Sequence, residues 1–328
     1  MKEILVTGGA GYIGSNVVNL LIKKKYKVII VDNLSTGHRK LIHRRASFYK
    51  VNILNTKELE NIFNTHKIDT VIHLAGLSII GESAKKPAVY FKNNVTGSTN
   101  LLKVMKKMGA KKIIFSSSAS VYGKPRYIPL DESHPVRPIS FYGKTKAVFE
   151  KKLKNFSARH GIRYLSLRYF NASGSSNGYG EIHIPETHLI PSAIKRLRKN
   201  EKITIFGNEY PTRDGTCIRD YVHVADIARA HVLGIKYLDS QRSRSGAMNL
   251  GSGRGYSVKQ IVTLCSRVSK KTLKIKIAPR RKGDPSVLIA SYKKAKKELG
   301  WSPRRSIHQI IKSAWEFEQK LYAEQIVT

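Results

Sequence analysis

Short apolar runs alternate with segments of helical periodicity through the first half of the chain. Six runs bounded by polar or turn-forming residues are predicted to be buried strands: 3–8, 27–32, 47–53, 70–76, 111–118 and 163–171. Four segments place apolar residues three or four positions apart and are predicted to be helices: 12–24, 56–66, 85–108 and 142–160. This alternation predicts a parallel sheet with helices on both faces.

The second half is less regular. Residues 174–188 are rich in turn-forming residues and are predicted to be a loop. The elements expected after it are a helix over 188–199, a strand over 202–207, a strand leading into a helix over 217–235, and a strand over 246–253. A small mixed region from about 257 to 322 closes the chain.

Length and composition indicate an ordinary globular protein. The chain has 328 residues, of which 41% are hydrophobic, so it can bury a large core in more than one unit. Its two cysteines, Cys217 and Cys265, form neither a disulfide framework nor a C-x-x-C motif, which favours a reducing compartment. We find no signal-peptide pattern and no apolar run near the ~20 residues that a membrane span needs, so a cytoplasmic location is expected.

The charge is unusual. Lysine and arginine number 60 against 22 acidic residues, a formal net charge of +38, which raises nucleic acid or an anionic membrane as a partner. The basic residues are spread along the chain, without a nucleic-acid-binding motif or a basic tail. A solvated basic surface is therefore the better interpretation, and no nucleic-acid or membrane partner is predicted.

A glycine-rich segment follows the first predicted strand and opens the first predicted helix. In "VTGGAGYIG", Gly9, Gly11 and Gly14 have the G-x-G-x-x-G spacing, and Gly8 extends it. Glycines allow a tight turn and a close approach to a pyrophosphate, which the N-terminus of the helix attracts. Asp32 ends the second strand, where a carboxylate accepts hydrogen bonds from ribose hydroxyls, so NAD is favoured over NADP despite the nearby Arg39.

Together these features predict a Rossmann-type doubly wound α/β fold with a smaller mixed α/β domain. Residues 1–171, with a contribution from about 217–250, are expected to form the NAD-binding domain. Residues 172–216 and 251–328 are expected to form the substrate domain.

Two further segments carry candidate chemistry. "IIFSSSASVYG" places Ser118 at the carboxyl end of a parallel strand, where ligands of such sheets bind. "SFYGKTK" places Tyr142 and Lys146 one turn apart on the next helix, whereas Lys144 lies off that face and is interpreted as a solvated charge. A neighbouring ammonium and an oxidised nicotinamide both favour the phenolate form of a tyrosine, so Tyr142 is a candidate acid/base.

Motifs over nearly the whole chain carry a family resemblance. They include "VTGGAGYIGSN", "FSSSASVYG", "YGKTK", "LRYFNASG", "ETHLIP" and "RDYVHVADIA". On these residues the sequence resembles the extended short-chain dehydrogenase/reductase family, and within it the UDP-hexose 4-epimerases. The resemblance implies an isomerase that inverts C4 of a UDP-hexose: Tyr142 removes the C4 hydroxyl proton, NAD takes and returns the hydride, and the 4-keto sugar turns over between the two transfers.

The resemblance also assigns roles to individual positions. It implies catalysis by Ser118, Tyr142 and Lys146, and no metal. The implied cofactor contacts are Gly8, Gly11, Tyr12, Ile13, Gly14, Asp32, Asn33, Asn52, Ile53, Leu74, Ala75, Gly76, Asn93, Ser116, Tyr142, Lys146 and Tyr169. The implied substrate contacts are Ser118, Tyr142, Asn171, His188, Leu189, Phe206, Arg219, Tyr221, Arg281, Asp284 and Leu288.

Four positions depart from the family pattern, and they leave the preferred sugar open. Asn52 and Ser78 replace an Asp and a Lys near the cofactor, and His188 replaces an Asn. Leu288 stands where a larger tyrosine can narrow the sugar pocket, which keeps an N-acetylated UDP-sugar as an alternative substrate.

The same motifs also bear on other reactions and on non-catalytic functions. Ala119 and Ser120 stand where related dehydratases and decarboxylases carry acids, so plain epimerisation is favoured. A non-catalytic sugar-nucleotide or nucleic-acid binder is disfavoured by the intact Tyr142 and Lys146. The resemblance implies a homodimer built from the helices within 85–108 and 142–160, although both are rich in lysine.

Overall fold

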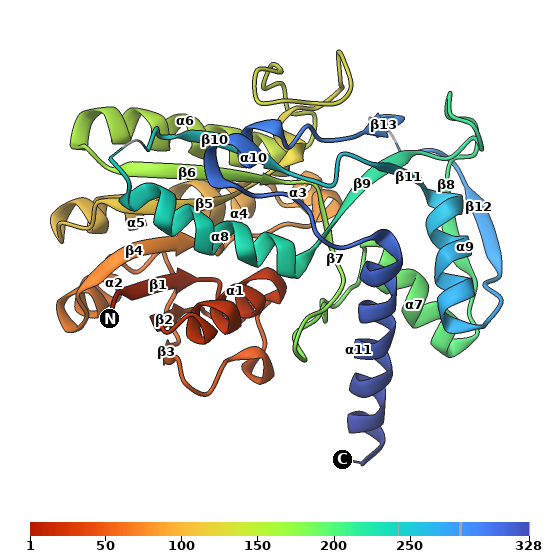
Figure 1. Cartoon of the computed structure of the whole chain (residues 1–328), viewed down its shortest axis with the longest axis horizontal. Coiled ribbons are helices and arrows are strands. Elements are labelled where there is room, and N and C mark those ends of the chain that lie inside the picture. The colour runs from red at the N-terminus through yellow and green to blue at the C-terminus, as the bar shows by residue number, and fades with distance from the viewer. Residues whose placement is uncertain (242, 282–283, 328) are drawn as a thin grey trace.

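The computed structural model describes residues 1–241, 243–281 and 284–327, and a seven-stranded sheet is its centre (Figure 1). The strand order is β10-β6-β5-β4-β1-β2-β3, and all six pairings are parallel. The strands are β1 (Glu3–Thr7), β2 (Lys27–Val31), β3 (Ser47–Tyr49), β4 (Ile68–His73), β5 (Lys112–Ser118), β6 (Arg163–Tyr169) and β10 (Gly246–Leu250). The order runs outward from β1 to β3 and, in the other direction, from β4 to β10, so the winding reverses between β1 and β4.

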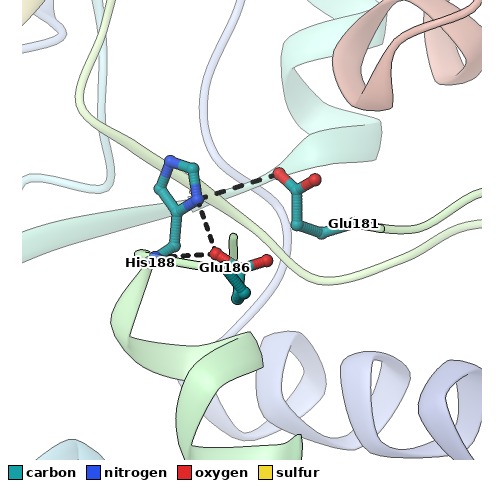
Figure 2. Close-up of side chains that lie close together, drawn as sticks. All are labelled: Glu181, Glu186 and His188. Carbon is teal, nitrogen blue, oxygen red and sulfur yellow. Dashed lines mark hydrogen bonds and ion pairs between the residues drawn. The ribbon is translucent and has the colours of Figure 1, made fainter. Parts of the chain in front are cut away.

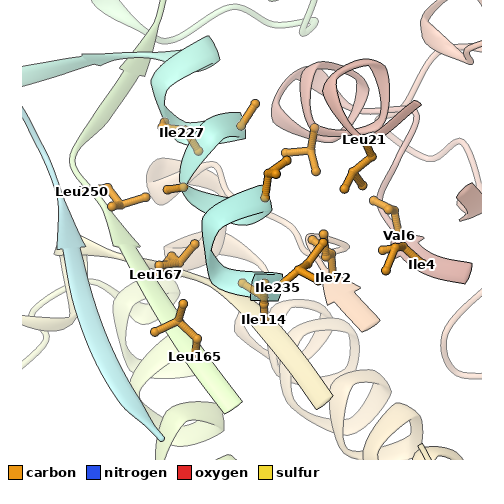
Figure 3. Close-up of a cluster of buried hydrophobic side chains, with 14 of the residues drawn as sticks. Ile4, Val6, Leu21, Ile72, Ile114, Leu165, Leu167, Ile227, Ile235 and Leu250 are labelled. Atoms are coloured by element: carbon orange, nitrogen blue, oxygen red, sulfur yellow. The ribbon is translucent and has the colours of Figure 1, made fainter. Parts of the chain in front are cut away.

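Two helices, α1 (Tyr12–Lys23) and α8 (Val224–Asp239), cover one face of this sheet. Ile4 and Val6 of β1 pack with Leu21 of α1, and the side chains of β5 and β6 pack under Ile227 and Ile235 of α8 (Figure 3). All of these residues are fully buried. The alternation of apolar side chains along each strand therefore supplies this layer of the core.

The opposite face is covered by α2 (Thr56–Thr65), α5 (Ser98–Lys107) and α6 (Phe141–His160). Its centre is aromatic: the rings of Phe115 on β5 and Phe149 on α6 meet edge to face, with centroids 4.7 Å apart. Both side chains are buried. This contact fixes the height of α6 above β5 and hence the positions of the polar residues on the same helix.

A second unit is built around β9 (Ile218–His223). That strand pairs with β7 (Asn171–Ser173), β11 (Gly255–Ser257) and β13 (Val287–Leu288), while β8 (Ile203–Phe206) pairs with β12 (Ile275–Ala278). The helices α7 (Leu189–Lys199), α9 (Val258–Ser269) and α11 (Ile307–Val327) enclose its apolar core (Figure 1). The short helix α10 (Lys293–Leu299) packs instead near α8 and β10.

The predicted α/β fold and the predicted helices and strands of the first half are confirmed, with shifts at their ends. The run 163–171 is divided into β6 and β7, and the strand expected over 47–53 ends at Tyr49. The helix expected over 85–108 comprises α4 (Pro87–Phe91), the π-helical segment η2 (Lys92–Gly97) and α5, with the unpredicted α3 (Ile80–Lys85) before it. No helix in the described ranges is long and apolar enough to cross a membrane.

We expect Phe149→Ala to lower the free energy of unfolding by about 3–5 kcal/mol, because it leaves a cavity beside Phe115. Chemical denaturation measures the change. Lys152→Ala, on an exposed position of the same helix, is the matched control and should change it by less than about 0.5 kcal/mol. Equal effects of the two variants would show that α6 is not anchored through this aromatic contact.

Candidate active site

A cavity of about 290 Å³ opens at the carboxyl ends of the parallel strands, where the winding reverses. Residues from the loops after β1, β2, β4, β5 and β6 line it, together with residues from α6 and from the loop 174–188. In open α/β sheets this reversal point is where ligands bind. All seventeen residues that the sequence assigned to the cofactor lie in its lining.

The glycine loop after β1 fits a pyrophosphate. Gly8 has a φ of +72°, and a Cβ on it would lie 2.6 Å from the backbone nitrogen of Ala75, so the loop needs glycine there to pass the end of β4. Gly11 differs, because its added Cβ would come no closer than 3.4 Å to the protein, at the Gly8 carbonyl. Packing therefore does not demand glycine at residue 11. Its missing side chain instead leaves open the approach to the N-terminus of α1, which no side chain caps.

Asp32 fits the ribose of a dinucleotide. Its two carboxylate oxygens accept separate hydrogen bonds, from the Leu34 nitrogen at 2.8 Å and from the Ala10 nitrogen at 3.0 Å. These bonds orient the carboxylate and leave a lone pair on each oxygen for a diol. Arg39 is exposed and is not among the cavity residues, so it does not offer a site for a 2′-phosphate there.

The start of α6 places Tyr142 beside the end of β5. Ser140 caps the helix by accepting a hydrogen bond from the Gly143 nitrogen at 3.0 Å. A Cβ on Gly143 would lie 2.4 Å from the carbonyl oxygen of Ser120, so only glycine allows this close approach. Tyr142 and Ser118, predicted from separate motifs, consequently line the same cavity.

Lys146 lies one turn further along, and its ammonium is buried. Nζ donates a 2.8 Å hydrogen bond to the Ser116 carbonyl and lies 5.8 Å from the centre of the Tyr142 ring. Burial lowers the pKa of Lys146 to about 8, against the charge of Glu150. The exposed Lys144 is a solvated charge, as predicted.

Burial opposes the phenolate form that the sequence analysis expects for Tyr142. Burial raises the pKa of Tyr142 to about 12, and the hydrogen bond with Ser118 offsets only part of that shift. The ammonium of Lys146 is bonded to a backbone carbonyl instead of the phenol oxygen. The protein alone therefore does not lower the pKa of Tyr142, and the expected phenolate form depends on the charge of an oxidised nicotinamide in the cavity.

Sequence reasoning missed the residues that hold these groups in place. Asn94, in η2, accepts a hydrogen bond from the Leu77 nitrogen at 2.8 Å and donates one to Thr145 of α6 at 3.1 Å. Ser83 of α3 accepts a hydrogen bond from the Tyr142 nitrogen at 3.1 Å. The available signal was the pair "NN" inside a long predicted helix, since π-helical turns occur frequently at functional sites.

A buried ion pair ties α6 to the sheet directly behind the catalytic candidates. Arg168 of β6 makes a two-pronged contact with Glu150 of α6, at 3.0 Å and 2.6 Å. Ser117 of β5 donates to the same carboxylate at 2.5 Å. Ser117 lies between Ser116, whose carbonyl holds Lys146, and the candidate Ser118. Glu150 therefore connects the helix α6 to the strands β5 and β6.

The predicted substrate residues divide into two groups. Ser118, Tyr142, Asn171 and His188 line the cavity, whereas the others lie on the second unit outside its lining: Leu189, Phe206, Arg219, Tyr221, Arg281, Asp284 and Leu288. Arg219 and Asp284 form an ion pair with each other, and the guanidinium of Arg281 lies 4.1 Å from the centre of the Phe206 ring. Their roles at a UDP site stay predictions.

Known proteins resemble the chain over almost its full length. A sequence profile described as the NAD dependent epimerase/dehydratase family matches residues 4–251. A UDP-glucose 4-epimerase of Halalkalibacterium halodurans is 46% identical over 321 residues, covering 97% of this chain and 96% of the relative. One of Streptococcus mutans is 45% identical, with 95% of each chain covered.

Solved structures agree with these relatives. A crystal structure of UDP-glucose 4-epimerase matches with a TM-score of 0.94 and 43% identity, over 97% of this chain and 98% of the other. The UDP-glucose 4-epimerase of Bifidobacterium longum in complex with NAD+ and UDP matches with a TM-score of 0.92 and 35% identity, over 97% and 98% of the two chains.

We expect Glu150→Leu to lower the free energy of unfolding by about 3–5 kcal/mol, because it leaves the charge of Arg168 buried and unpaired. The double variant Glu150→Leu/Arg168→Leu should recover a large part of that loss, since no buried charge remains. Urea unfolding of the three proteins measures both effects.

The exposed pair of Glu60 and Lys107 provides the control. Glu60→Leu should cost less than about 1 kcal/mol. A double variant at residues 150 and 168 that is as unstable as the sum of its single variants would contradict the coupling.

Proposed function

The chain belongs to the NAD-dependent epimerase/dehydratase family, and on that premise we propose that it is a UDP-glucose 4-epimerase, an isomerase that interconverts UDP-glucose and UDP-galactose. The observation that carries the proposal is the convergence of Ser118, Tyr142 and Lys146 on one cavity with the glycine loop and Asp32. NAD, when bound, supplies a hydride acceptor for C4 of the sugar and returns the hydride to it.

The protein's own part in this reaction is proton transfer and positioning. Ser118 and Tyr142 line the cavity where they can hydrogen-bond the C4 oxygen. Tyr142, as the phenolate that the charge of an oxidised nicotinamide favours, accepts the hydroxyl proton and gives it back. Lys146 is anchored at the Ser116 carbonyl, so its position is fixed relative to Tyr142 without a direct bond to the phenol oxygen. Holding these groups on α6 and β5 sets their geometry before the substrate arrives.

The UDP portion is assigned to the second unit. Arg219 and Arg281 offer guanidinium groups that suit phosphate oxygens, and Asp284 and Phe206 hold them in position. Asn171, whose side chain donates to the Asp220 carbonyl at 2.7 Å, connects this unit to the cavity. A firmly held nucleotide with a loosely held sugar permits the keto sugar to turn over.

An N-acetylated sugar is not favoured as the main substrate, since the relatives at 40–46% identity are named UDP-glucose 4-epimerases. Leu288 nevertheless packs against the buried cluster that includes Ala119, the residue after Ser118. We propose that its size sets the room available to a substituent at C2 of the sugar.

A homodimer is the proposed assembly, and it is supported by exposed apolar side chains on the expected helices. Val89 and Phe91 of α4 are 52% and 44% exposed, and Val148 of the adjoining α6 is 37% exposed. We place the enzyme in the cytoplasm, which the two free, buried cysteines support.

Tyr142→Phe is expected to lower the turnover of UDP-galactose by about 10²–10⁴-fold, the usual contribution of a positioned proton donor and acceptor. A coupled assay that measures the formation of UDP-glucose provides the rate. Lys144→Met, in the same turn but solvent-exposed, should keep the parent rate. Near-normal turnover by Tyr142→Phe would rule out this mechanism.

Light scattering at physiological salt should give twice the chain mass of 36.9 kDa. Phe91→Glu should shift the protein to the monomer, because it places a charge in the proposed apolar interface. Ile275→Glu, on the equally exposed β12, should leave the dimer intact. A monomer for the parent protein, or a dimer for Phe91→Glu, would remove this interface from consideration.

A further inference from the structure

The loop 174–188 contains two Glu-x-His units with the same internal geometry. In the first, Oε1 of Glu181 meets both the backbone nitrogen of His183, at 3.1 Å, and its Nδ1, at 2.5 Å. In the second, Oε1 of Glu186 meets the backbone nitrogen of His188, at 2.7 Å, and its Nδ1, at 2.9 Å (Figure 2). Each glutamate thus fixes the ring of the histidine two residues later.

The two units are joined through Glu181. Its second oxygen, Oε2, lies 3.9 Å from Nδ1 of His188, and the two imidazole rings are 6.3 Å apart. The glutamate side chains are only 9% and 6% exposed, and Oε2 of Glu186 is buried without a hydrogen-bond partner among the described residues. Two carboxylates so placed need positive charge nearby, and the two imidazoles are the groups that can provide it.

The orientation of both rings leaves one nitrogen for a ligand. Nδ1 of each ring is occupied by a carboxylate, and Figure 2 shows the other ring nitrogen of His188 turned away from both glutamates. Nε2 of His183 and of His188 makes no hydrogen bond with any other residue that the structure describes. Both histidines line the cavity, His188 at the start of α7.

We propose that His183 and His188, held by Glu181 and Glu186, act together with Arg219 and Arg281 and bind the diphosphate of the UDP-sugar as a pair of imidazolium groups. The inference rests on the proposed function for the identity of the anion. It adds His183 as a binding residue and the two glutamates as positioning residues. With neutral rings, two buried carboxylates would face the diphosphate and repel it, whereas protonated rings cancel their charge and offer two N–H donors. Binding of the diphosphate therefore takes up protons.

The electrostatic surroundings agree with protonated rings. The bond with Glu181 raises the pKa of His183 against the effect of burial. Burial alone would lower the pKa of His188, but Glu186 and Glu181 raise it above its ordinary value. A group with a raised pKa stays charged to a higher pH, so the two histidines are charged at low pH and lose their charge as the pH rises through the raised pKa values.

Other titratable groups lie on the elements around the two histidines, and they have their own partners or shifted pKa values. Tyr12 of α1 donates to the Gly174 carbonyl, and burial keeps its pKa well above 10. Asp32 is bonded to backbone nitrogens, and Glu318 of α11 is paired with Arg198 of α7. Burial lowers the pKa of His38, so burial works against a charge on that ring.

Calorimetry of UDP binding to the NAD-loaded protein tests the proposal. Titrations at pH 8 in buffers of different ionisation enthalpy should reveal net proton uptake, and the affinity should fall by up to about tenfold per pH unit for each proton taken up. His188→Asn and His183→Asn should each reduce the uptake, and Glu186→Gln should reduce it by releasing His188. In turnover, His183→Asn should raise KM and leave kcat near the parent value.

His43→Asn is the matched control. The His43 ring lies 6.5 Å from that of Tyr179 in the same loop, and burial lowers its pKa. UDP binding without proton uptake, or uptake unchanged in both histidine variants, would overturn the inference while leaving a working epimerase. Loss of UDP affinity on adding EDTA would overturn it in favour of a bound metal ion. Absence of both UDP binding and turnover would instead refute the proposed function itself.

Discussion

The buried pair of Glu150 and Arg168 is the interaction on which the active site depends. It joins the helix that carries Tyr142 and Lys146 to the strand beside Ser118, and Ser117 completes the junction. An ion pair is a costly way to join two elements in a protein interior, since the desolvation of both charges offsets most of their attraction. Its value here is directional: two parallel hydrogen bonds fix the helix in rotation and height, which apolar packing between Phe115 and Phe149 does less strictly.

The acidic residues are few, and several of them are buried with structural partners. The chain carries 22 of them against 60 basic ones, and several have structural partners that no basic residue could replace. Asp226 is fully buried and accepts from the backbone nitrogens of Arg304 and Arg305, and Asp220 accepts from those of Ser252 and Gly253. The strong positive charge therefore reflects a surface poor in acids, while the acids that organise the interior remain.

Much of the fold and part of the site could be predicted from the sequence. Buried parallel strands produce continuous apolar runs in the sequence. The glycine loop and the spacing of Tyr142 and Lys146 are local patterns too, so all of them could be predicted from the sequence. Glu150, Arg168 and Asn94 were not, because each acts through a partner distant in the sequence, and a lone polar residue in a helix or strand gives no sign of that partner. The burial of Tyr142 was hidden for a related reason: spacing identifies neighbours, whereas burial, which raises the pKa of this phenol, is a property of the whole fold.

The return of the chain to the main sheet has a consequence for how the protein is made. In chain order, β7, β8 and β9 of the second unit come before α8, which covers the main sheet, and before β10, which forms its edge. Until Asp239, the last residue of α8, has left the ribosome, the face formed by Ile72, Ile114 and Leu165 lacks the complete helix that buries it. Roughly the first three quarters of the polypeptide must therefore be synthesised before the nucleotide-binding half can close, and nascent chains shorter than this present an apolar surface to chaperones.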